Sequence, residues 1–152
     1  MAGSSSKGVE SKKVVKEIVL KEELELEFVL NVGIVKDSEL SIPFRTKLSS
    51  DKWNLFLPVQ GFEDILLGFL KEGEDVRLRD AIQVNVFDKG GHEFQMMLKK
   101  WQQGSHYCYV LNRGWFTFCD QHHLHENDLV SFRTFRHAIS HILSFLVTYK
   151  RI

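Results

Sequence analysis

The sequence contains little proline and little cysteine. Its 152 residues include two prolines, two cysteines and ten glycines. So few prolines and glycines exclude a collagen-like chain and long disorder. Two cysteines cannot build a disulfide framework, and they suit a reducing compartment better. The uninterrupted apolar runs span only a few residues, which excludes a membrane helix, and residues 2–13 lack the apolar stretch of a secretory signal.

The chain also lacks an excess of charge of either sign. It has 20 Lys and Arg against 20 Asp and Glu, with a pI of about 7.1. Proteins that bind nucleic acids usually carry a basic excess. Residues 1–40 hold six basic and eight acidic side chains, and residues 41–152 hold fourteen and twelve. Any DNA-binding surface must therefore be a local patch.

Catalytic signatures are missing too. The sequence has no glycine-rich phosphate loop, no G-x-S-x-G and no H-E-x-x-H motif. No carboxylate cluster is suited to hold the two metal ions of a nuclease. Cys119 and His122, with His123 and His125 nearby, have the spacing of a zinc pair, but structural zinc needs a second pair. We therefore expect no enzymatic activity, no bound metal and no cofactor, and we interpret these histidines as a solvated helix end.

Phenylalanine is abundant, with twelve residues against three Tyr and three Trp. The length fits one domain with an aromatic core. We divide the chain into a disordered tail (1–13), an extension that forms a short helix, a strand or both (14–40) and a domain (41–152). In the extension, every second residue from Leu24 to Ile34 is apolar, as in a half-buried strand. This segment could cover an edge of the sheet or mediate contact with a protein partner or a second copy of the chain.

Short alternating segments dominate the rest of the chain. They predict strands at about 42–48, 55–57, 82–86, 94–98, 107–111, 129–135 and 139–149. Asp88 to Gly91 and Gln102 to Ser105 are expected to reverse the chain. Apolar residues at helical spacing predict a helix from Phe62 to Leu70 that stops at Gly73, and a second lies near 116–123. This pattern indicates a closed or nearly closed β-structure with two short helices.

Several motifs resemble the plant-specific B3 DNA-binding domain family, most closely a divergent subgroup with an N-terminal extension. The matching residues are Lys47-Leu48-Ser49-Ser50-Asp51, Leu55-Phe56-Leu57-Pro58, Leu98-Lys99-Lys100-Trp101, Tyr109-Val110-Leu111-Asn112-Arg113-Gly114-Trp115, Phe118, Leu124, Asp128 and Phe132. The resemblance covers about residues 42–149. It implies a mostly β (α+β) fold, a seven-stranded open pseudobarrel with two short flanking helices. It also implies a nuclear transcription factor or regulator that binds double-stranded DNA in the major groove, gripping it with two arms.

The resemblance also implies the DNA-contacting residues. These are Lys47, Ser49, Ser50, Lys52, Trp53 and Asn54 at the N-terminal arm, and Lys99, Lys100, Trp101, Gln102, Gln103, Ser105, His106 and Arg113 at the C-terminal arm. Lysine and arginine suit phosphate contacts, whereas the two glutamine amides suit the edge of adenine. Asp51 and Asp128 are interpreted as turn or cap residues.

Two departures from the family pattern bear on recognition. Asn54 stands where many members have arginine, which removes a strong fork-shaped donor. Asn127 replaces a glycine before Asp128, a mild change because asparagine tolerates a left-handed backbone. Trp53 and Trp101 fit equally well as DNA contacts or as packed aromatic residues at the barrel rim. An alternative function is a degenerate B3-like module that mainly binds another protein.

Overall fold

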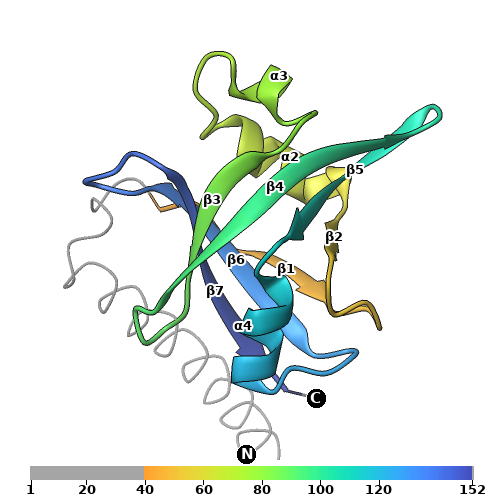
Figure 1. Ribbon diagram of the computed structural model, residues 1–152, viewed down its shortest axis with the longest axis vertical. Coiled ribbons are helices and arrows are strands. Elements are labelled where there is room, and N and C mark those ends of the chain that lie inside the picture. The colour runs from red at the N-terminus through yellow and green to blue at the C-terminus, as the bar shows by residue number, and fades with distance from the viewer. Residues whose placement is uncertain (1–39, 152) are drawn as a thin grey trace, which may run out of the picture.

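A computed structural model describes residues 40–151, and the predicted tail and extension lie outside this range except for Leu40. Seven strands form one barrel-shaped sheet with three short helices around it (Figure 1). The strands are β1 (Phe44–Lys47), β2 (Leu55–Leu57), β3 (Ile82–Phe87), β4 (Glu93–Gln103), β5 (His106–Asn112), β6 (Leu129–Arg136) and β7 (Leu143–Lys150). The helices are α2 (Val59–Leu67), α3 (Glu74–Arg77) and α4 (Trp115–His122). The predicted seven-stranded open pseudobarrel is confirmed.

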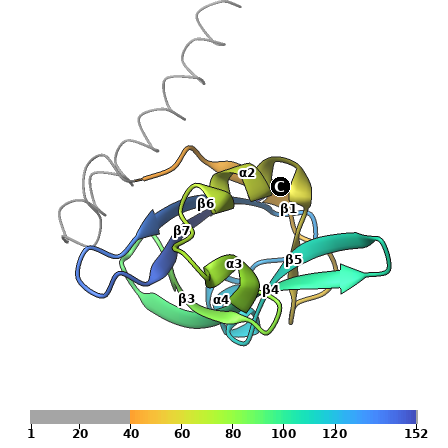
Figure 2. The same ribbon diagram turned by 90° about the horizontal axis from the view of Figure 1, so that it is seen from above.

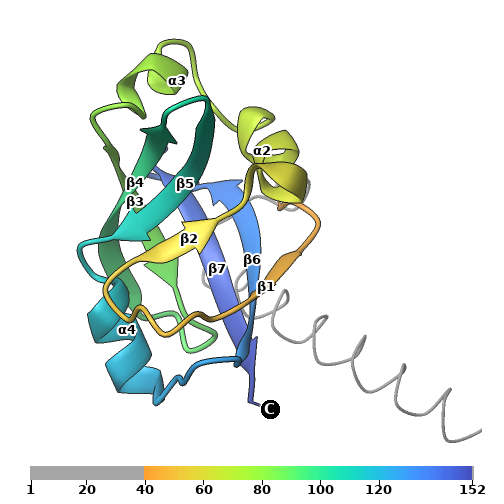
Figure 3. The ribbon, with the colours of Figure 1, turned by 90° about the vertical axis from the view of Figure 1, so that its right-hand side faces the viewer.

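The strand order is β1-β6-β7-β3-β4-β5-β2. All neighbours are antiparallel except β3 and β7, which run parallel. Seen from above, the strands curl into a ring, and the helices and connecting loops lie at the ends of the barrel (Figure 2). The edge strands β1 and β2 come to the same side of the molecule, and the loop between them runs beneath β2 (Figure 3). The barrel is therefore open between its first two strands, and this loop connects them.

The aromatic residues of the B3-like motif form the centre of the core. Trp115 stacks on Phe118 at 5.3 Å between ring centroids and also contacts Phe132. These rings and Leu124 are almost completely buried. Inward-facing residues of most strands complete the same cluster. The motif spacing therefore reflects how the core is built, and the predicted DNA-contacting residues lie outside this cluster.

Backbone conformation explains the residue types found at Gly114 and Asn127. Gly114 has φ 155°, and a Cβ atom there would lie 2.5 Å from the carbonyl oxygen of Gln95 on β4. Asn127 has φ 74°, which confirms that this asparagine takes the left-handed conformation expected of the usual glycine. The carboxylate of Asp128 accepts the backbone N–H of His125 at 2.8 Å, so its predicted cap role is also confirmed.

Several element boundaries differ from the prediction. The helix predicted to stop at Gly73 ends at Leu67, and Gly73 instead precedes α3 with φ 86°. Ile42 and Ile139 were predicted to lie in strands, but both lie in loops outside β1 and β7 and are 72% and 79% exposed. The helix α3 was not predicted from the sequence pattern. Its position depends on Arg136 of β6, whose guanidinium pairs with Glu74 and donates to the carbonyl of Phe69.

The histidines near the end of α4 have different surroundings. His123 and His125 are exposed, as expected, but His122 is not part of a solvated helix end. Its Nε2 lies 3.1 Å from the buried Asp88 carboxylate and its Nδ1 lies 3.2 Å from the Tyr149 hydroxyl. Burial raises the pKa of the Cys119 thiol to about 12. His122 therefore connects the β3–β4 turn to the last strand, and Cys119 is an apolar filler.

No helix within residues 40–151 is both long and apolar enough to cross a membrane.

Candidate nucleic-acid interface

The loop 49–54, which we call the N-arm, is ordered by one carboxylate. Asp51 Oδ1 accepts the backbone N–H groups of Trp53 at 2.9 Å and Asn54 at 3.0 Å. Its Oδ2 accepts the Asn54 side-chain amide at 3.3 Å. The bond from the Asn54 backbone, with smaller contributions from Trp53 and the Asn54 side chain, outweighs burial and lowers the Asp51 pKa. The turn role predicted for Asp51 is therefore confirmed.

Trp53 fixes the middle of the N-arm against α4. Its ring stacks on Phe116, with 4.4 Å between centroids and 12° between planes. It is nevertheless 66% exposed. Ser49, Ser50 and Lys52 beside it are exposed as well. Trp53 therefore packs at the barrel rim while keeping most of its surface available.

The second predicted arm is the far end of the β4–β5 hairpin, residues 101–106, which we call the C-arm. The hairpin projects well beyond the barrel, at the upper right of Figure 1. Gln103 pairs with His106, so Gly104 and Ser105 form a two-residue turn. Gly104 has φ 62°, the left-handed conformation that such a turn needs at its first position. Every residue from Trp101 to His106 is exposed.

The pleat of β4 separates the predicted contacts. Lys99, Trp101 and Gln103 share one face because alternate side chains of a strand point the same way. Lys100 and Gln102 therefore point to the opposite face.

Lys100 is held on its own face by aromatic contacts. Its Nζ lies 4.0 Å from the centroid of the Tyr107 ring. The hydroxyls of Tyr107 and Tyr109 donate to the Glu63 carboxylate at 2.8 Å and 2.7 Å. The hydrogen bond to Glu63 raises the pKa of Tyr107. Burial, together with Glu63, raises the pKa of Tyr109. Lys100 thus lies beside a structural network that includes an acidic group.

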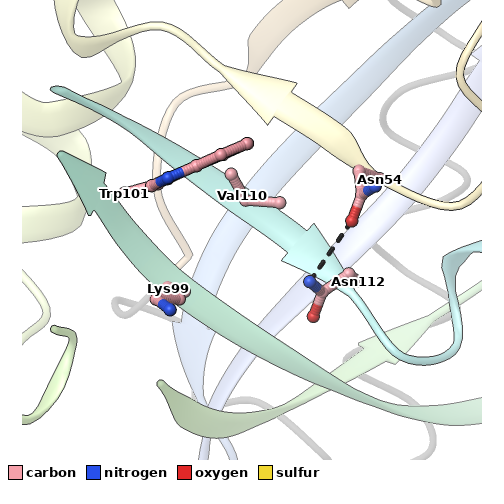
Figure 4. Close-up of a pocket in the computed structure, with 5 residues that line it drawn as sticks. All are labelled: Asn54, Lys99, Trp101, Val110 and Asn112. Carbon is pink, nitrogen blue, oxygen red and sulfur yellow. Dashed lines mark hydrogen bonds between the residues drawn. The ribbon is translucent and has the colours of Figure 1, made fainter. Parts of the chain in front are cut away.

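A pocket of about 230 Å³ joins the two arms at the sheet surface (Figure 4). It is lined by Asn54, Lys99, Trp101, Val110 and Asn112. The Asn112 amide donates to Asn54 Oδ1 at 3.3 Å, which links β5 to the N-arm.

Phe56 of β2 stacks on Trp101 at 5.8 Å beside the pocket. Phe56, Val110 and Asn112 were not among the predicted DNA-contacting residues. Strand alternation alone could have suggested them, but the pairing of β5 with both β2 and β4 was needed to bring them together.

A family model supplies the identity of the fold. The model of the At2g31720-like B3 domain-containing proteins matches residues 36–151. The chain belongs to the B3 domain-containing family. The resemblance predicted from the motifs is therefore confirmed, and the match includes both arms.

Solved structures agree on the B3 fold. The chain is similar to a structure described as the Arabidopsis FUS3–DNA complex, with a TM-score of 0.52 and 19% identity over 72% of this chain and 97% of that one. It is also similar to the hypothetical Arabidopsis thaliana protein At1g16640.1, with a TM-score of 0.50 and 19% identity over 76% and 94% of the two chains. A search of curated proteins finds no match. At this identity the two structures support the fold alone.

Charge is unevenly distributed over the B3 domain. Segments 44–56 and 99–113, which contain both arms and their supporting strands, carry one acidic residue, Asp51. Their six basic residues are Arg45, Lys47, Lys52, Lys99, Lys100 and Arg113. The rest of residues 40–151 carries eight basic and eleven acidic residues. Overall neutrality therefore conceals two basic segments that lie on the same side of the barrel (Figures 1 and 3).

The structure thus brings together only some of the predicted site residues. Asn54, Lys99 and Trp101 meet at the pocket. Lys47 is exposed on the edge strand β1, and Arg113 is exposed at the junction of β5 and α4. The other predicted residues of the two arms do not line this pocket.

Proposed function

We propose that this B3 domain binds double-stranded DNA in the major groove through the N-arm and C-arm, and acts as a regulator of transcription in the nucleus. The observation that carries the proposal is the concentration of basic residues on the two segments that form the arms. A basic patch attracts the phosphate backbone even when the whole chain is neutral. Membership of the B3 family, in which one similar structure is described as a complex with DNA, supports the same ligand.

The arms offer two kinds of contact. Lys47, Lys52, Lys99 and Arg113 suit phosphate oxygens, which position a protein on the duplex without reading its sequence. The amide of Gln103 suits a base edge, where it can both donate and accept hydrogen bonds. The proposal therefore separates residues that supply affinity from residues that supply sequence preference.

Salt dependence tests the proposal. With three or four phosphate contacts, the logarithm of the binding constant should fall against the logarithm of salt concentration with a slope of about −3. The double variant Lys99→Ala with Arg113→Ala should reduce the slope to about −1. The matched control, Lys89→Ala with Lys150→Ala, removes two exposed cations outside the arms and should leave the slope unchanged. A salt-independent affinity for the unmodified protein would contradict DNA binding.

A protein partner is the second candidate, because two stacked aromatic pairs are exposed on the arm side of the barrel. Trp53 pairs with Phe116, and Phe56 pairs with Trp101, all four being exposed. Exposed aromatic residues are frequent anchors of protein interfaces. The N-terminal extension is a separate candidate for contact with a second copy of the chain. Light scattering after size exclusion, with and without residues 1–36, tests this role. A truncated chain that stays folded, monomeric and able to bind DNA would argue against this function for the extension.

A further inference from the structure

Asn112 is held in one orientation by a chain of side-chain hydrogen bonds. Asp51 Oδ2 accepts the Asn54 amide at 3.3 Å, and Asn54 Oδ1 accepts the Asn112 amide at 3.3 Å. Asn112 is the last residue of β5 and lines the pocket between the arms (Figure 4). Its side chain is therefore oriented before any ligand arrives.

This orientation leaves half of the Asn112 amide unused. One of its two N–H groups binds Asn54, and Oδ1 has no hydrogen-bond partner among residues 40–151. A free acceptor beside a free donor matches adenine, which presents the N6 amino group and N7 in the major groove. Asn54 lacks this capacity, because both ends of its amide are already engaged.

The rest of the pocket is suited to thymine. Val110 and Trp101 give it an apolar lining, and Phe56 supports the Trp101 ring from the side. Thymine is the one DNA base with a methyl group in the major groove, and apolar side chains recognise it. Lys99 lies at the same pocket and can bind a neighbouring phosphate.

We infer that this pocket recognises one adenine–thymine base pair, with the Asn112 amide on adenine and the Val110–Trp101 surface against the thymine methyl group. The inference rests on the proposed DNA binding and adds a specificity-determining residue, Asn112. Asn54 and Asp51 are positioning residues, because their hydrogen bonds orient the Asn112 side chain.

Duplex selection from a random library tests this inference with three proteins. The unmodified chain should yield a motif with at least one A·T position. Asn112→Ala should lose preference at one A·T position only, with about ten-fold weaker binding to the original motif. The control Gln121→Ala removes an exposed amide from the last turn of α4, outside both arms, and should return the original motif.

A second measurement uses the unmodified protein and does not depend on a variant that folds. Each thymine of the selected duplex is replaced in turn by deoxyuridine, which lacks only the methyl group. Binding should weaken about three- to four-fold at the same base pair that Asn112→Ala makes degenerate, since burying one methyl contributes about that much.

The outcomes separate the two proposals. If the unmodified chain selects no duplex, both the proposed function and this inference are wrong. If it selects a motif that Asn112→Ala leaves unchanged, DNA binding stands and the role of Asn112 is wrong. If deoxyuridine weakens binding only at other positions, the assignment of the thymine methyl group to this pocket is wrong.

Discussion

At the scale of single residues, Gly114 shows how one backbone position fixes the junction between β5 and α4. A side chain there would collide with the carbonyl oxygen of Gln95, which belongs to the adjacent strand and cannot move freely. Gly114→Ala should lower the free energy of unfolding by about 3 kcal/mol, measured by urea denaturation. Gly73→Ala is the matched control, because Gly73 also has positive φ but no atom within 4 Å of the added Cβ. It should cost about 1 kcal/mol, and equal costs would contradict a steric role for Gly114.

Asp51 gives a prediction about pH at the same scale. Its pKa is lowered in the folded protein, so the stability that it contributes is present above its unfolded value of about 3.8 and is lost as the pH falls through the lower folded value. Asp51→Ala should cost about 1 kcal/mol of unfolding free energy at pH 7 and much less near pH 2.

Asp64→Ala, which removes an exposed carboxylate on α2, serves as the control for Asp51. It should change stability little at either pH. A cost of Asp51→Ala that stays the same down to pH 2 would contradict the importance of the ionised carboxylate in the N-arm.

At the scale of elements, the pleat of β4 assigns different roles to adjacent lysines. Lys99→Ala should weaken binding to all duplexes alike and reduce the salt slope by about one. Lys100→Ala should affect DNA binding less, because its ammonium group lies over Tyr107, near Glu63. It should instead cost about 0.5–1 kcal/mol of stability. Titrations at several salt concentrations and urea denaturation measure both effects, and equal salt slopes for the two variants would refute the distinction.

The same strand shows what the sequence could and could not predict. Alternation located β3, β4 and their hairpin, since the alternating apolar residues of both strands are buried in the core or packed against it. It could not place Lys99 and Lys100 in different surroundings, because that depends on Tyr107 and Glu63 from other elements. The end of α2 at Leu67 and the presence of α3 depend likewise on Arg136, which is more than 60 residues away in the sequence.

At the scale of the whole molecule, composition was the least informative guide to the interface. Equal numbers of acidic and basic residues predict at most a local basic patch and do not locate it, whereas the two arm-bearing segments hold six basic residues and one acidic residue. The motif residues identified the family because they form the core. The pocket around Asn112 was not predictable in this way, since it exists only when β2, β4 and β5 are paired.

The position of β7 has a consequence for biosynthesis. Among the seven strands of the barrel, β7 is synthesised last, yet it lies in the interior of the sheet between β6 and β3. Until it emerges, both of these neighbours have an unpaired edge, and such edges promote aggregation. The barrel therefore cannot close before residues 143–150 have been synthesised, and a chain that ends before residue 143 is expected to aggregate more readily than the whole domain.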